Sequence, residues 1–101
     1  MTDRFTIHGI KSEALEAHAI ERLTHALNQH EDRVVSVNLR LEDVNGPKGG
    51  ADQKAKAIIS LRGASEIVIE ECGEDAYAVF STLADRVKNA VGRKLDKVTR
   101  R

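Results

Sequence analysis

The chain has 101 residues, of which 41% are apolar, and this composition predicts one globular domain with a modest core rather than a disordered segment. Its 16 Lys and Arg balance 16 Asp and Glu, so it lacks the basic excess that is usual for a dedicated nucleic-acid module. With two Phe, one Tyr and no Trp, it also lacks the aromatic platforms on which unpaired bases stack.

Nothing in the sequence predicts export or a membrane. No apolar run approaches the roughly 18 residues of a membrane span, and residues 1–11 contain no apolar signal core. The single Cys72 cannot form an internal disulfide, so nothing indicates an oxidising compartment. We therefore expect a cytoplasmic protein that is one domain over residues 1–101.

The first half of the chain predicts a strand, a helix and a second strand. Phe5 and Ile7 alternate with polar residues, which predicts a short strand over residues 4–8. Ser12 is the expected N-cap of a helix that runs to about Gln29. Residues 35–41 then alternate strictly, as a strand with one apolar face does. The apolar side chains of that strand are Val35, Val37, Leu39 and Leu41.

The second half predicts a loop, a hairpin and a long helix. After a glycine-rich loop over residues 45–50, residues 54–61 alternate again as a strand. A short turn at residues 63–65 should pair this strand antiparallel with residues 66–71. The last helix is expected over residues 74–101 and has apolar residues at steps of three and four. They are Tyr77, Phe80, Leu83, Ala84, Val87, Val91, Leu95 and Val98.

The order β-α-β-β-β-α predicts an α+β fold. The first two strands should be parallel and the other pairs antiparallel, in a four-stranded mixed sheet with both helices packed on one face. The opposite face would then be solvated or contact a partner. It would carry Thr6, His8, Ser36, Asn38, Arg40, Lys54, Lys56, Ser60, Arg62, Glu66 and Glu70.

Positive charge is concentrated in the last helix. Residues 86–101 contain seven cations and one anion, a formal charge of +6 that the rest of the chain balances. Four of these cations fall within an arc of about 60° away from the apolar stripe: Arg86, Arg93, Lys97 and Arg100. Such a stripe is either a solvated face or a set of phosphate contacts. A candidate second surface on the open sheet face consists of Arg40, Lys54, Lys56 and Arg62.

No motif for catalysis or metal binding is recognised. The glycines of residues 46–50 do not form a phosphate loop, and His18 and His25 lack both the i, i+4 spacing and the third ligand of a metal site. Cys72 has no nearby base motif and is expected to fill a strand end as a small apolar residue. We expect a non-enzyme with no cofactor, no metal and no small-molecule substrate.

Three stretches of the sequence form a pattern: LEDVNGPKGGAD at residues 41–52, IVIE at residues 67–70, and DAYAVF at residues 75–80 followed by ADR at residues 84–86. This pattern resembles the ribosome hibernation-promoting factor family, also called ribosome-associated inhibitor or sigma modulation protein. The resemblance covers nearly the whole chain and agrees with the order β-α-β-β-β-α. The chain looks like the short form, without the extra C-terminal dimerisation domain of long members.

The resemblance implies a protein that binds the small ribosomal subunit in the channel used by tRNA and mRNA. It would inhibit translation and promote ribosome hibernation in stress or stationary phase, with rRNA phosphates as its contacts and with no membrane partner. The free protein is expected to be monomeric. Together with Arg100 of the basic stripe, the candidate rRNA-binding residues are Arg86, Arg93, Lys94, Lys97, Lys54 and Lys56.

The sequence departs from the family pattern in its first helix. First helices of the family usually carry several Lys or Arg, whereas here Arg22 stands nearly alone among Glu and His. The alternative hypothesis is therefore a non-enzymatic protein-interaction module, or a divergent paralogue with an acidic protein partner and little affinity for the ribosome.

Overall fold

The computed structural model describes residues 2–45 and 51–99, and the side chains of residues 3–44 and 52–96. Most of the loop predicted at residues 45–50, and the end of the chain from Arg100, lie outside this description. The elements, with η marking a short 3-10 helix, are η1 (Thr2–Arg4), β1 (Phe5–His8), α1 (Glu13–Leu27), η2 (Asn28–Arg33), β2 (Val34–Asn45), β3 (Ala51–Leu61), β4 (Ile67–Gly73) and α2 (Ala76–Thr99).

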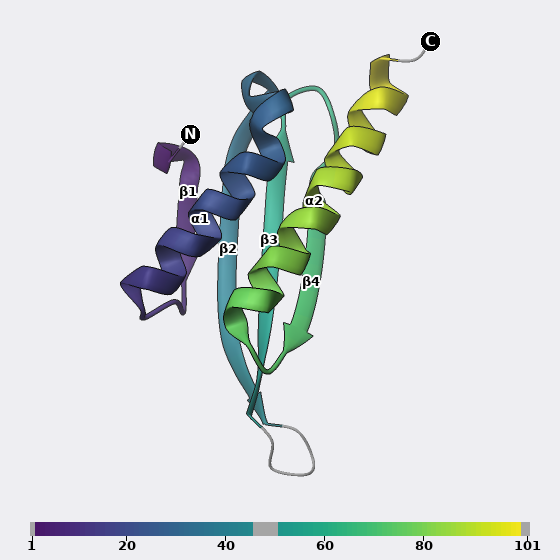
Figure 1. The fold of residues 1–101 in the computed structure, drawn as a ribbon. Helices are drawn as coiled ribbons and strands as arrows, with labels where there is room; N and C mark the ends of the chain where they lie inside the picture. The colour runs from purple at the N-terminus through teal and green to yellow at the C-terminus, as the bar shows by residue number, and fades with distance from the viewer. Residues whose placement is uncertain (1, 46–50, 100–101) are drawn as a thin grey trace.

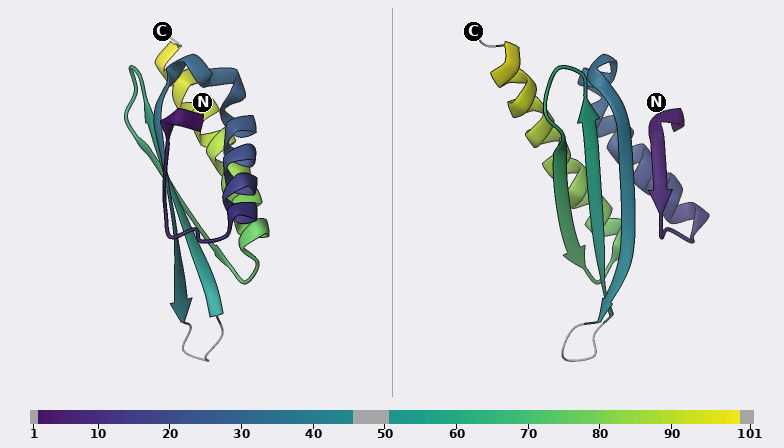
Figure 2. Two further views of the ribbon diagram at one scale, coloured as in Figure 1. Left: turned by 90° about the vertical axis from the view of Figure 1, so that its left-hand side faces the viewer. Right: turned by 180° about the vertical axis from the view of Figure 1, so that it is seen from behind.

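The four strands form one sheet in the order β1-β2-β3-β4. β1 is parallel to β2, and the other two pairs are antiparallel. α1 and α2 lie side by side over one face of the sheet (Figure 1), and the opposite face is left uncovered when the molecule is seen from behind (Figure 2). The predicted α+β fold with the order β-α-β-β-β-α is confirmed.

Both helices begin at side chains that cap their first backbone N–H groups. The Ser12 hydroxyl accepts a hydrogen bond from the backbone N–H of Leu15 at 3.2 Å, as the predicted N-cap of α1 should. At the start of α2, the Asp75 carboxylate accepts one from the backbone N–H of Tyr77 at 3.0 Å. These bonds satisfy donors that have no partner inside the helix, so each helix has a defined start.

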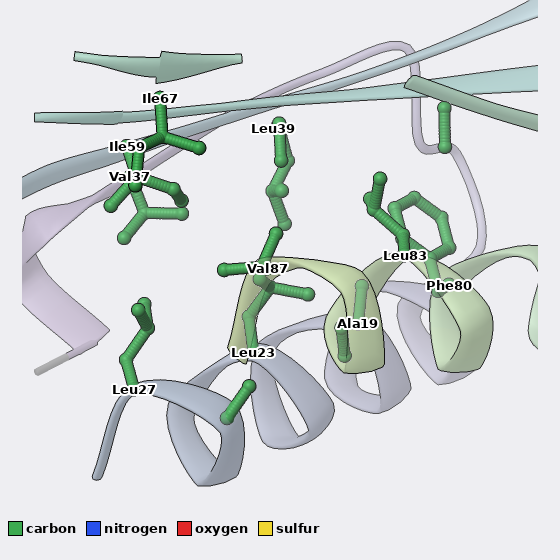
Figure 3. Close-up of a cluster of buried hydrophobic side chains, with 14 of the residues drawn as sticks. Ala19, Leu23, Leu27, Val37, Leu39, Ile59, Ile67, Phe80, Leu83 and Val87 are labelled. Carbon is green, nitrogen blue, oxygen red and sulfur yellow. The ribbon is translucent and has the colours of Figure 1, made fainter. Parts of the chain in front are cut away.

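The core lies between the sheet and the two helices (Figure 3). Leu23 of α1, Leu39 of β2 and Phe80 of α2 are each 0% exposed. Burying one such side chain stabilises the fold by about 1.5–3 kcal/mol. No buried polar or charged residue occurs among the described side chains, so this layer is held by apolar packing.

Sequence alternation assigned one residue of β2 to the wrong face. Val35 was expected in the core, but its side chain is 54% exposed, whereas Val34 is buried at 3%. The pairing of β2 with β3 shifts register between Val34 and Ser36, and this irregularity inverts the facing of the first residues. The remaining core residues of the strand, Val37 and Leu39, face the helices as predicted.

Two glycines differ in what surrounds them. Gly9, directly after β1, has a φ of +82°, and a Cβ atom there would overlap the backbone carbonyl oxygen of Leu41 on β2. Only glycine permits both that conformation and that close approach. Apart from its chain neighbours and the backbone of its own helix, no described atom lies within 4 Å of where the Cβ of Gly92 would lie, so this glycine marks no close contact with another described element.

Candidate nucleic-acid interface

Arg86, the arginine of the ADR stretch, is already bonded within the protein. Its guanidinium donates to the Glu71 carboxylate at 2.7 Å and to the backbone carbonyl of Glu70 at 2.9 Å. Both acceptors belong to β4, one of the two edge strands of the sheet. Arg86 therefore fastens α2 to the sheet edge, and only its remaining N–H groups can reach a ligand.

The other candidate cations of α2 differ in whether they already bond to groups within the protein. Lys94 is half-buried, and its ammonium donates to the Ser65 hydroxyl at 2.6 Å in the turn between β3 and β4. Arg93 is exposed and has no hydrogen bond or ion pair with the described residues. Lys97 lies on α2 but its side chain is not described, and Arg100 lies outside the described residues.

The open sheet face separates the two predicted lysines of β3. The Lys54 ammonium lies 3.3 Å from the Glu70 carboxylate and is neutralised by it. Lys56 forms no ion pair with any described residue and lies opposite Arg40 in the β2–β3 register. The two lysines therefore present different charges to a partner, although they are two residues apart on the same face.

The register also reveals candidate residues that the predicted rRNA-binding set does not include. His8 of β1 pairs with Arg40 of β2, and Arg40 pairs with Lys56 of β3. Sequence alternation had placed all three on the open face, but strand pairing is a long-range property that alternation does not specify. These three side chains form a row across β1, β2 and β3. The one sequence signal for this row was that each of the three predicted strands has a basic or His residue on its polar face.

The seam between the two helices contains polar contacts and no basic patch. The Nε2 atom of His18 lies 3.1 Å from the Tyr77 carbonyl and 3.2 Å from the Ser81 hydroxyl, and its ring stacks at a tilt against Tyr77 with a centroid distance of 5.0 Å. Arg22 pairs with Asp85 at 3.6 Å. Tyr77, a member of the predicted apolar stripe, is 43% exposed, and its ring packs on His18 of α1.

The described residues show no cluster suited to metal chemistry. No group of three or more His, Cys, Asp or Glu side chains within the described ranges could hold a metal ion. Cys72 is exposed, so the expectation that it fills a buried strand end is wrong. In the described portion of the chain, neither helix combines the length and hydropathy needed to cross a membrane.

The positions of these residues can be compared with known proteins. The family model described as sigma 54 modulation protein / S30EA ribosomal protein matches residues 5–99. The chain belongs to this family. The sequence motifs had pointed to the same family under its names of hibernation-promoting factor and sigma modulation protein, so that prediction is confirmed.

Two solved structures share the fold of this chain. A ribosomal subunit interface protein from Coxiella burnetii superimposes with a TM-score of 0.74 at 15% identity, covering 88% of this chain and 93% of that one. The N-terminal domain of Protein Y from Thermus thermophilus gives a TM-score of 0.64 at 18% identity, with the same coverage of 88% and 93%. At these identities the likeness shows the fold alone. No curated protein matches the chain significantly in sequence.

Proposed function

We propose that this family member is a cytoplasmic, non-enzymatic regulator of translation that binds the small ribosomal subunit through rRNA phosphates. By occupying the subunit it inhibits translation and promotes ribosome hibernation under stress. Membership of a family described by a ribosomal protein supports the ribosome as the partner. The name of the Coxiella burnetii structure, a ribosomal subunit interface protein, supports the same choice.

The observation that carries the proposal is the exposed guanidinium of Arg93, which has no partner among the described residues and lies on the one strongly basic segment of a neutral chain. A cation without an internal partner can bond a phosphate without breaking an existing contact, and arginine can do so through two parallel hydrogen bonds. On the sheet, Lys56 likewise has no ion pair with any described residue. We therefore assign the largest contributions to Arg93 and Lys56, with Lys97 and Arg100 continuing the α2 stripe.

The remaining members of the proposed set contribute in a different way. Arg86, Lys94 and Lys54 each have a partner within the protein. A phosphate must compete with those partners or share the donor, so each of these residues adds less to affinity than an unpaired cation does. The seven residues are thus expected to contribute unequally to binding affinity, and the loss of affinity in single variants measures the difference.

Ribosome pelleting at low and moderate salt tests the proposal. The variant is the double charge reversal Arg93→Glu/Lys97→Glu, and the matched control is Lys88→Glu, an exposed lysine of α2 that is five positions from Arg93 and so faces another side of the helix. Arg86 is left unchanged, because a carboxylate there would repel Glu71 and disturb the fold.

We expect wild type and the Lys88 variant to pellet with small subunits at low salt and to be released as salt rises. The double variant should lose at least about tenfold in affinity, since hydrogen bonds to charged groups contribute about 1.5–3 kcal/mol each. Pelleting of the double variant at the wild-type level would show that the α2 stripe does not bind phosphates. Failure of wild type to pellet would overturn the choice of the ribosome.

The free protein is proposed to be a monomer. An exposed sheet edge is the usual route to self-pairing, and the two edges of this sheet are β1 and β4. β1 has four residues, and the carbonyl of Glu70 on β4 is already occupied by Arg86. Light scattering of nuclease-treated protein should give the mass of one chain, and a stable dimer would contradict this part of the proposal.

A further inference from the structure

We infer that the open face of the sheet carries a second phosphate-binding site, formed by His8, Arg40 and Lys56, which contacts a nucleic-acid backbone on the side of the molecule opposite the helices. The inference rests on the proposed function, because it takes RNA as the ligand. It adds His8 and Arg40 to the binding residues. It also makes the protein two-sided, with one anion-binding surface on α2 and another on the sheet.

The strand pairing brings the three side chains into one row. His8 pairs with Arg40 across β1 and β2, and Arg40 pairs with Lys56 across β2 and β3. Neighbouring strands are about 4.8 Å apart, so three residues in a row span about 10 Å. Arg and Lys side chains are longer than one strand spacing, and Arg40 and Lys56 can therefore converge on one phosphate, with His8 placed beside them.

The row lies on the face away from the helices. His8 and Arg40 are exposed and Lys56 is half-buried, whereas Leu39 on β2 and Ala57 on β3, next to them in sequence, are 0% exposed in the core. The view from behind shows this face of the strands without a covering element (Figure 2). A ligand can reach the row directly.

The charges of the row are unfavourable without a ligand. Like charges directly opposite each other on adjacent strands destabilise a sheet, and Arg40 and Lys56 stand in that relation. Glu70 is the register partner of Lys56 on β4, but its carboxylate pairs with Lys54 instead. Within the described residues, neither Arg40 nor Lys56 has an ion pair. An anion bound between them removes the repulsion.

The backbone at one end of the row is held in place. Gly9 follows His8 directly and lies against the backbone of Leu41, the residue after Arg40. This contact fixes the end of β1 beside β2, and with it the position of His8 relative to Arg40. The row is thus built on rigid strands instead of a loop, which lowers the entropy lost when a ligand binds.

The chemistry of the face favours a nucleic-acid backbone over an acidic protein. Protein interfaces rely on buried aromatic anchors, and none of the aromatic residues is on this face: Phe5 packs against the core, Phe80 is buried, and Tyr77 is on α2. The apolar side chains next to the row are aliphatic: Ile58 is half-buried and Val68 is 49% exposed. Phosphate contacts require cations and hydrogen-bond donors only.

The variant that tests the site is Arg40→Gln/Lys56→Gln, which removes both charges and keeps polar side chains of similar length. Its matched control is Arg22→Gln/Lys88→Gln, which removes two charges from the helical side, outside both proposed surfaces. The probe is a short fluorescein-labelled RNA stem-loop, and its anisotropy is followed at several salt concentrations. Amide NMR shifts of the wild-type protein during titration with the same stem-loop locate the contact.

We expect the sheet variant to bind the stem-loop at least about tenfold more weakly, and the slope of log affinity against log salt to fall by about one, as for one lost phosphate contact. The control should keep the wild-type slope. In wild type, the amides of Arg40 and Lys56 should shift and saturate together. An unchanged slope in the sheet variant, or unshifted amides in this row, overturns the inference.

The comparison with ribosome pelleting separates this inference from the proposed function. If wild type pellets with small subunits and the sheet variant pellets equally well, the sheet site is wrong and the function stands. If the stem-loop shifts the row but wild type does not pellet, the site stands and the ribosome is wrong. A final titration uses poly-glutamate as an acidic peptide. If poly-glutamate shifts the amide signals of Arg40 and Lys56 and RNA does not, the partner of this site is an acidic protein and the inference is wrong.

Discussion

Arg86 of α2 donates a 2.7 Å hydrogen bond to the carboxylate of Glu71 on β4. The same guanidinium also reaches the neighbouring carbonyl of Glu70 at 2.9 Å. A residue that was predicted to bind rRNA from a resemblance thus fastens a helix to an edge strand. The cations of α2 consequently divide into those that bond within the protein and those that have no such bond among the described residues.

The first prediction separates these two roles. Arg86→Gln should lower the free energy of unfolding by up to about 1 kcal/mol, the range of exposed ion pairs, because it removes the bond to Glu71. Arg93→Gln should leave stability unchanged, since Arg93 has no partner among the described residues. Urea unfolding of both variants, with a double-mutant cycle of Arg86 and Glu71, measures the coupling. Strictly additive effects in that cycle would show that the pair contributes nothing.

The second prediction concerns the end of β1. Gly9→Ala should lower the free energy of unfolding by more than about 2 kcal/mol, because the left-handed backbone costs about 1–2 kcal/mol and the new Cβ also overlaps the Leu41 carbonyl oxygen. Gly63→Ala is the matched control. It has a similar φ of +77°, but its Cβ would meet only the end of the Arg33 side chain at 3.2 Å. Equal losses in the two variants, measured by urea unfolding, would argue against the backbone contact at Gly9.

The third prediction is a stabilising substitution in α2. Gly92→Ala should raise the free energy of unfolding by about 1 kcal/mol, the difference in helix propensity, because the added Cβ would meet no described atom from outside its own helix within 4 Å. It enters a hollow of about 250 Å³ that His30, Arg33 and Leu95 also line. For a domain of this size the gain corresponds to a rise in Tm of about 4–8 °C. A fall in Tm on thermal unfolding would indicate a steric or functional demand for glycine.

The fourth prediction concerns the seam between the helices. His18→Ala should lower the free energy of unfolding by about 0.5–1.5 kcal/mol, because the Nε2 atom of His18 lies within hydrogen-bond distance of both the Tyr77 carbonyl and the Ser81 hydroxyl. Ser81→Ala alone should cost less, since it leaves the bond to the Tyr77 carbonyl in place. The double variant gives the coupling free energy between His18 and Ser81. A coupling free energy of zero would show that the contact between the two side chains does not contribute to stability.

Local patterns were sufficient for the order of the strands and α-helices, the fold class and the general place of the charges, but they missed the 3-10 helices η1 and η2 and the longer extent of β2 and β3. Strand alternation and helical steps of three and four residues depend on neighbours only, and so does the capping of α1 by Ser12. They failed at Val35, where the register of β2 against β3 shifts and turns the side chain to solvent. They also failed at Cys72, whose exposure depends on what covers the end of β4.

The sequence by itself determined that positive charge collects on α2 and that a sheet face remains open. Only the tertiary structure decided which cations are occupied. It paired Arg86 with Glu71 and Lys54 with Glu70, and it set Arg40 opposite Lys56. The physical reason is distance along the chain: these partners are 15 or 16 residues apart, and only strand pairing and helix packing bring them together. Helical and strand periodicities act over a few residues and cannot encode that proximity.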